Sequence, residues 1–282
     1  MSPPVTDLRS RIETHAAAAA DGPDADAARE AALDLLAALE AGDVRAAERS
    51  ADGTWAANTW VKQGILLALR LGRMTDQTAG PFAFFDKDTV PPQAFTAARG
   101  VRIVPGGSSI RRGAYVAAGV VCMPPMYVNV GAYVDSGTMV DSHALVGSCA
   151  QIGKNVHLSA AAQIGGVLEP VGAAPVVIED GVFVGGGCGV YEGTVVREGA
   201  VLAAGVILTR GSRVYDLTTG TVLRAENGRP LDIPARAVVV PGARAVDSDF
   251  GRAHGLSVSA PVIVKIRDAR TDAATTLEEA LR

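Results

Sequence analysis

The strongest constraint on this chain is a six-residue period in its aliphatic side chains. Every sixth position from residue 110 to 164, and again from 178 to 214, holds Ile, Val, Leu or Cys. These seventeen positions are Ile110, Val116, Cys122, Val128, Val134, Val140, Val146, Ile152, Leu158, Ile164, Ile178, Val184, Val190, Val196, Leu202, Leu208 and Val214. The four residue types make up only about a quarter of the chain, so the pattern is not chance. A period of six is typical of a parallel β-helix in which three short strands form one coil.

Such a prism places residues eighteen apart on top of one another, at about 4.8 Å per coil. The fourth residue after each aliphatic is usually small or β-branched, as in Ala132, Thr138 and Ala144, which suits a narrow corner. Each coil buries the aliphatic residues of its neighbours, and the open ends need a cover. The predicted fold is therefore mainly β, with a covering segment before and after the repeat.

The chain divides into three predicted parts. Residues 1–100 should form an α-helical N-terminal domain, because apolar residues recur at helical spacing over 27–41 and 58–71 and a glycine follows each run. Residues 101–245 should form the β-helix. Residues 246–282 should form a small C-terminal cap, consisting of a strand from Ser257 to Ile266 and a short helix from Asp272.

Two loop excursions interrupt the predicted prism, at residues 165–177 and 218–234. Fourteen residues separate Ile164 from Ile178 where the repeat needs six, so about eight extra residues leave the coil. Loops that leave a rigid scaffold commonly carry binding residues. The first excursion is therefore the place where a functional site is expected.

Composition and charge limit the partners and the cell compartment that can be expected. The chain has 282 residues and a net charge of −4, which argues against a nucleic-acid or anionic-membrane partner. Its three cysteines are an odd number, and Cys122 and Cys188 occupy inward positions, so we expect buried thiols and a reducing compartment. There is no apolar run of about 18 residues and no basic-plus-apolar leader at the N-terminus. A cytoplasmic location is expected.

Several strings go beyond the generic repeat. They are VNVGAYVDSGTMVD at 128–141, VGSCAQIGKNVHLS at 146–159, IGGVLEP at 164–170, YEG at 191–193, SRVYD at 212–216, VIVK at 262–265 and DGTW at 52–55. Together they closely resemble the tetrahydrodipicolinate N-succinyltransferase family. Left-handed hexapeptide β-helices mostly belong to trimeric acyl-CoA-dependent acyltransferases, so the resemblance implies a left-handed prism and a homotrimer with active sites between subunits.

The resemblance also implies an activity. The family transfers a succinyl group from succinyl-CoA to tetrahydrodipicolinate, with water, giving N-succinyl-2-amino-6-oxopimelate and CoA in the succinylase branch of diaminopimelate and lysine biosynthesis. Succinyl-CoA would be a co-substrate, and neither a permanently bound cofactor nor a metal is expected. The expected partners are these small molecules and other copies of the chain.

Asp141 is the catalytic residue that the resemblance implies, as a general base. It follows the inward Val140, so its side chain should point away from the prism. The alternative role is a corner aspartate that accepts hydrogen bonds from backbone amides, because Asp135 occupies the same repeat slot. Arg102 matches a family arginine that contacts the dicarboxylate, which a guanidinium can bind in bidentate fashion. Its alternative is a surface arginine ahead of the repeat.

The remaining implied contacts concern carboxylates and CoA. Glu169 and Glu192 are expected to bind substrate, and the expected CoA contacts are Gly166, Ala204, Arg213 and Lys265. Many family members carry a glutamate three residues before the position of Glu192, whereas this chain has Gly189. That departure puts a two-carboxylate mechanism in doubt and leaves the preferred acyl donor open.

The same fold also supports three other functions. A zinc enzyme like the γ-carbonic anhydrases needs three converging histidines, but only His143 and His157 lie in the repeat, and their spacing of fourteen does not stack them. An acetyl-CoA-dependent N- or O-acetyltransferase would use His157 first. A scaffold without catalysis is the third possibility.

Overall fold

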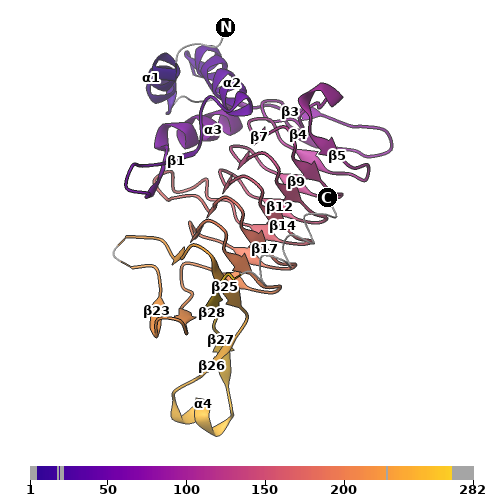
Figure 1. Cartoon of the computed structure of the whole chain (residues 1–282). Helices are drawn as coiled ribbons and strands as arrows, with labels where there is room; N and C mark the ends of the chain where they lie inside the picture. Colours follow the sequence, from indigo (N-terminus) through magenta and orange to yellow (C-terminus); the bar gives the residue numbers. More distant parts are fainter. Residues whose placement is uncertain (1–4, 18, 20–21, 227, 269–282) are drawn as a thin grey trace.

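The computed structural model describes residues 5–17, 19, 22–226 and 228–268. Figure 1 shows a helical N-terminal part, a stack of parallel coils and a C-terminal arm that projects from the far end. The coils form three parallel sheets, and these are the three faces of a prism. No helix in the described part of the chain is long and apolar enough to span a bilayer.

The three faces are named here by their strands. The first face contains β7 (Tyr115–Val116), β10 (Tyr133–Val134), β13 (Gln151–Ile152), β16 (Val177–Ile178), β19 (Val195–Val196) and β24 (Asp232–Ile233). The second contains β5 (Arg102–Ile103), β8 (Val121–Cys122), β11 (Met139–Val140), β14 (His157–Leu158), β17 (Phe183–Val184), β20 (Val201–Leu202) and β25 (Ala237–Val240). The third contains β6 (Ser109–Ile110), β9 (Tyr127–Val128), β12 (Leu145–Val146), β15 (Gln163–Ile164), β18 (Gly189–Val190) and β21 (Ile207–Leu208). The chain visits the faces in the order third, first, second, so three corners join them: corner 3–1, corner 1–2 and corner 2–3.

The predicted register is confirmed. Tyr133 pairs with Tyr115 eighteen residues earlier, and Gln151 pairs with Val177, which is 26 residues later, or eighteen plus the eight extra residues. All seventeen aliphatic positions of the six-residue period are buried. Their side chains fill the inside of the prism, since the second residue of each short strand points inward and the first points outward.

Val214, the last predicted repeat position, does not continue the first face as expected. Val214 is buried, but its strand β22 (Val214–Asp216) does not stack on β19 of the first face. It pairs instead with β23 (Thr221–Leu223) and β28 (Val262–Ile266) at the end of the second face. Ile233 of β24 takes the place on Val196. The predicted excursion 218–234 therefore ends too late, because β24 already belongs to the prism.

The C-terminal part also differs from the prediction. The expected strand from Ser257 to Ile266 is two strands, β27 (Ser257–Ser259) and β28, which are separated around Pro261. A proline has no N–H for a ladder hydrogen bond, so a break there is natural. β27 pairs with β26 (Ala243–Ala245), and the short helix α4 (Asp249–Ala253) lies between them at the tip of the arm. The helix predicted from Asp272 lies outside the described residues.

The N-terminal part contains the two helices predicted over 27–41 and 58–71, and it adds a further helix, α1, and two hairpins that the sequence did not reveal. The helices are α1 (Val5–His15), α2 (Ala25–Ala41) and α3 (Thr59–Leu71). The hairpins are β1 (Ala47–Arg49) with β2 (Trp55–Ala57), and β3 (Met74–Asp76) with β4 (Phe85–Lys87); a 3-10 turn, Ala97–Arg99, precedes the prism. The helices share a core that includes Val130 and Cys149 of corner 3–1, so they pack directly on the prism. The exact domain boundaries stay a prediction.

Candidate active site

Asp141 lies at corner 2–3, immediately after β11. Its side chain is half-buried, and Oδ1 accepts a hydrogen bond from the backbone N–H of Ser142 at 2.6 Å. Asp135 makes the matching contact with Ser136 at 2.7 Å, at corner 1–2. Both aspartates thus accept a hydrogen bond from a backbone amide at a corner, which is the alternative role considered for Asp141 from the sequence. This contact uses one carboxylate oxygen, so Oδ2 of Asp141 can still accept a proton or a hydrogen bond.

Arg102 and two of the expected CoA contacts share the second face or its edge with Asp141. Arg102 is exposed in β5, two rungs from β11 in the same sheet, or about 10 Å by strand spacing. Ala204 is exposed at corner 2–3 after β20. Lys265 lies in β28, where its Nζ contacts both carboxylate oxygens of Asp268 at 3.1 Å. A phosphate would compete with that carboxylate for Lys265.

The other expected site residues gather at corner 3–1. Gly166 and Glu169 are exposed in the loop that follows β15, called here the 165–176 loop. Glu192 follows β18 and is exposed, and its Oε2 accepts a hydrogen bond from the N–H of Arg210 at 2.9 Å. Arg213 is exposed after β21. Two carboxylates and a guanidinium therefore line this edge of the prism.

Within one chain, the residues around Asp141 and those around Gly166 lie apart. Asp141 stands before β12, and Gly166 stands after β15, which is the neighbouring strand on the third face. The two groups thus lie at opposite edges of one face and at nearly the same height along the prism. A site that used both would need the corner 2–3 of one copy to meet the corner 3–1 of another.

The Gly189 departure has a structural counterpart. A Cβ atom built on Gly189 would lie 2.5 Å from Cε2 and 2.9 Å from the hydroxyl oxygen of Tyr191. One built on Gly165 would lie 2.7 Å from Cδ1 of the same ring. The Tyr191 ring therefore fills the space that a side chain at residue 189 would need. The sequence revealed that the glutamate is missing, but not that the Tyr191 ring lies over residue 189.

Lys62 is another residue near this edge whose role the sequence did not reveal. Its side chain is fully buried on α3, and its Nζ donates a 2.5 Å hydrogen bond to the carbonyl oxygen of Ala173 in the 165–176 loop. Burial lowers the pKa of this amine, and the Cys149 thiol nearby opposes that shift. Leu168 of the same loop packs on the N-terminal core. The loop that carries Glu169 is thus held by the N-terminal domain, which a single sequence cannot reveal.

The histidines lie apart. His143 is exposed at corner 2–3, whereas His157 is buried in the second face with its ring 5.0 Å from that of Phe183. Among the described residues, no group of three His, Cys, Asp or Glu side chains is placed to hold a metal ion.

Comparison with known proteins places this geometry in context. A family model described as "Tetrahydrodipicolinate N-succinyltransferase N-terminal" matches residues 7–71, and one described as "Hexapeptide repeat of succinyl-transferase" matches residues 175–210. The repeat match and the three parallel faces agree with the predicted left-handed β-helix. A solved structure of a putative 2,3,4,5-tetrahydropyridine-2-carboxylate N-succinyltransferase from Campylobacter jejuni covers 83% of this chain and 62% of its own, at 16% identity and a TM-score of 0.49.

Relatives named 2,3,4,5-tetrahydropyridine-2,6-dicarboxylate N-succinyltransferase match part of the chain. The protein of Leptothrix cholodnii is 46% identical over 109 residues, which are 36% of this chain and 38% of the relative. That of Granulibacter bethesdensis is 47% identical over 104 residues (34% and 36%), and that of an Azoarcus species is 48% identical over 112 residues (37% and 39%). This chain therefore matches well under half the length of these relatives. Within those limits the predicted resemblance is confirmed: the chain carries an N-terminal domain and a hexapeptide repeat similar to those of the tetrahydrodipicolinate N-succinyltransferases.

Proposed function

We propose that the chain is a CoA-dependent N-acyltransferase that moves a succinyl group from succinyl-CoA to tetrahydrodipicolinate. Water adds to the C=N bond of the cyclic imine, and the C–N bond of the resulting carbinolamine breaks to give an open-chain amino ketone. The amine nitrogen attacks the thioester carbonyl and loses a proton, the C–S bond breaks, and the thiolate takes up a proton, so that CoA leaves as a thiol. The product is N-succinyl-2-amino-6-oxopimelate. This is the succinylase step of diaminopimelate and lysine synthesis.

The match of residues 7–71 to the N-terminal family domain carries this proposal. A hexapeptide prism alone supports many acyl acceptors, so the fold does not identify a substrate. The N-terminal domain is more specific, and it packs on the loop beside the candidate site, because Lys62 bonds to Ala173 of that loop and Leu168 of the loop packs on the helical core. An acetyltransferase of the same fold remains the alternative, because Gly189 replaces a carboxylate that many relatives have.

Asp141 is the general base in this proposal. Its Oδ2 would take a proton as the water adds or as the nitrogen attacks, while Oδ1 stays fixed by the N–H of Ser142. Arg102 would pair with one carboxylate of the acceptor, and Glu169 and Glu192 would contact its polar groups. Backbone amides at Gly166 and Ala204 would bind the CoA arm, with Arg213 and Lys265 near its phosphates.

The site would lie between subunits of a homotrimer. Asp141 and the Gly166 group occupy opposite edges of the third face, and a three-fold arrangement of prisms would join the edge of one copy to that of the next. A cytoplasmic location, expected from the sequence, stays part of the proposal.

Thiol release from succinyl-CoA tests the proposal. The purified protein should release CoA only when tetrahydrodipicolinate is present, and Asp141→Asn should lower kcat by about 100-fold or more, because the carboxylate no longer accepts a proton. Asp43→Asn, which changes an exposed carboxylate on the N-terminal domain, serves as the matched control. Acetyl-CoA is run in parallel: faster turnover with it would move the protein to the acetyltransferase alternative. If the protein turns over neither succinyl-CoA nor acetyl-CoA, both the succinyltransferase and the acetyltransferase functions are overturned.

A further inference from the structure

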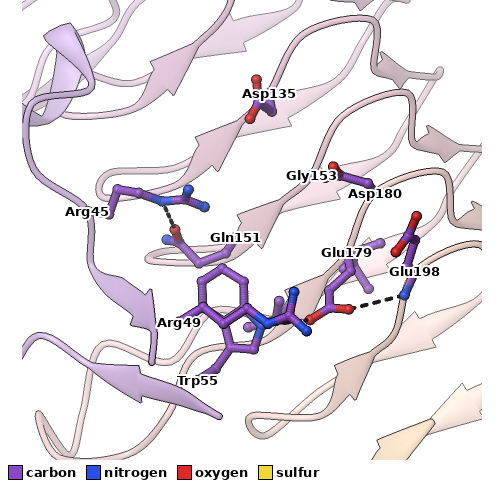
Figure 2. A pocket seen from close by; sticks show the side chains of 11 residues that line it. Arg45, Arg49, Trp55, Asp135, Gln151, Gly153, Glu179, Asp180 and Glu198 are labelled. Atoms are coloured by element: carbon purple, nitrogen blue, oxygen red, sulfur yellow. Dashed lines mark hydrogen bonds and ion pairs between the residues drawn. The ribbon is translucent and has the colours of Figure 1, made fainter. Parts of the chain in front are cut away.

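A cavity of about 340 Å³ lies between the N-terminal domain and the first face at corner 1–2, away from Asp141 and Glu169. Figure 2 shows Arg45 on one side, Asp135 and Asp180 across from it, and Trp55 below. The volume falls within the range of small-molecule sites. Nothing in the proposed acyl transfer uses this cavity.

Residue 153, in the wall of the cavity, has no side chain, and Asp180 occupies the space that one would need. Gly153 stands in the repeat slot that Asp135 fills one rung earlier and Glu179 fills one rung later. A Cβ atom there would collide with Asp180, whose Oδ1 accepts a hydrogen bond from the N–H of Lys154 at 2.8 Å. The glycine thus lets the Asp180 carboxylate lie against the prism wall.

The positive side of the cavity is Arg45. Its guanidinium carbon lies 3.7 Å from the centre of the Tyr133 ring, and its Nε donates to Oε1 of Gln151 at 2.9 Å. Gln151 is buried and its Nε2 donates to the carbonyl oxygen of Cys149, so the guanidinium is fixed in one orientation. Nε is already used, and the two terminal nitrogens of Arg45 are the donors left for a carboxylate.

The negative side consists of Asp135 and Asp180. Each uses Oδ1 for a backbone amide, which leaves Oδ2 to accept another hydrogen bond. No ion pair in the described part of the chain joins either of them to Arg45, although both are close enough to raise its pKa against the lowering caused by burial. Opposite charges therefore face each other across the hollow without touching.

The floor of the cavity is already complete. Glu179 is buried and accepts hydrogen bonds from Nε1 of Trp55 at 2.9 Å, Nη1 of Arg197 at 3.0 Å and the N–H of Glu198 at 3.2 Å. Arg197 is in turn paired with Asp232, which raises its pKa. This network gives the Trp55 indole a fixed position beside the hollow. A ligand would meet a preformed surface there.

We propose that this cavity binds a free basic amino acid. Its α-carboxylate pairs with Arg45, its ammonium groups bind Asp135 and Asp180, and its methylene chain lies on the Trp55 ring. Only a molecule with both charges bridges the two sides. The lining holds four carboxylates (Asp135, Glu179, Asp180 and Glu198) against two guanidiniums (Arg45 and Arg49), a net −2, which favours a ligand with a net positive charge. The proposal is independent of the acyl transfer.

Calorimetric titration of the full chain with L-lysine tests it. We expect saturable binding of one L-lysine per chain with a Kd between about 10 µM and 1 mM. L-norleucine lacks the side-chain ammonium and cadaverine lacks the carboxylate, so each should bind at least about tenfold more weakly. Asp180→Asn keeps the oxygen that accepts from Lys154 but removes the charge, and it should weaken L-lysine binding about tenfold.

The controls separate this site from the catalytic one. Asp141→Asn should bind L-lysine like the wild type, even if it no longer transfers succinyl groups. Arg45→Gln should weaken the binding of L-lysine more than that of cadaverine, because only L-lysine has a carboxylate that Arg45 would bind. Absence of saturable binding up to about 10 mM, or equal affinity of the wild type and Asp180→Asn for L-lysine, would overturn the proposal.

Discussion

Tyr191 determines what can stand at residue 189, where this chain has a glycine and the resemblance implies a glutamate in many family members. Its ring covers both Gly189 and Gly165, so the two glycines and the tyrosine form one packed unit at the edge of the third face. A carboxylate at residue 189 would have to displace that ring. With the ring in this position, residue 189 has no room for a side chain.

We expect Gly189→Ala to lower the free energy of unfolding by about 1–3 kcal/mol, because the new methyl group overlaps the Tyr191 ring. Tyr191→Ala opens that space, so the double variant should be less destabilised than the sum of the two single variants. Urea unfolding of all four proteins in the cycle measures this coupling. Strict additivity would mean that the ring does not occupy the space above Gly189.

At the scale of elements, the 165–176 loop is fixed from outside the prism. Lys62 reaches it from α3, and Leu168 packs back on the helical core. An amine that is fully buried loses its hydration, and the Ala173 carbonyl replaces part of it. The order of this loop should therefore depend on a residue more than 100 positions earlier in the chain.

Lys62→Met keeps the apolar stem but removes the hydrogen bond to Ala173, and it should increase amide hydrogen exchange within the 165–176 loop. We expect the free energy of unfolding to fall by about 1–3 kcal/mol, because the carbonyl of Ala173 loses its hydrogen-bond partner. Lys154→Met, at an exposed lysine on the prism, is the control and should leave exchange in the loop unchanged. Unaltered exchange in Lys62→Met would show that Leu168 alone holds the loop.

The same variant should show a pH dependence. Burial lowers the pKa of Lys62 below the ordinary 10.5, so the unfolded chain binds more protons than the folded one between those two values. The stability of the wild type relative to Lys62→Met should therefore rise as the pH increases toward 10.5. Chemical denaturation at several pH values measures this difference; a fall with rising pH would contradict the assignment.

At the scale of the whole molecule, the separation of Asp141 from Glu169 and Glu192 predicts complementation. Asp141→Asn and the double variant Glu169→Gln/Glu192→Gln should each be inactive. If sites form between subunits, mixed trimers made by refolding equal amounts together should regain about a quarter of wild-type activity, because half of each kind of corner is intact. Light scattering should give three times the 28.8 kDa chain mass for every sample. No regain of activity in mixed trimers would place the whole site within one chain.

The period of six was sufficient to predict the prism, its register and its buried residues, because every coil imposes the same packing requirement. Val214 shows the limit: a buried valine at the right spacing satisfied the pattern, but β22 joined a different sheet and Ile233 took its place. The resemblance predicted individual site residues but not their distribution over two edges, which depends on the order of the faces. Lys62, Tyr191 and the Arg45 cavity depend on contacts between distant segments, and one sequence does not contain that information.

The antiparallel strands at the end of the second face have a consequence for solubility. A parallel prism that simply stopped would offer its last coil as a template, and another molecule could add to it without limit. Here β25 pairs with β28 in the antiparallel sense, and β22 and β23 close the sheet as a hairpin. At the opposite end α2 packs beside β7. At one end of the second face and at the other end of the first face, these elements thus lie at the edge where a strand of another molecule would otherwise add.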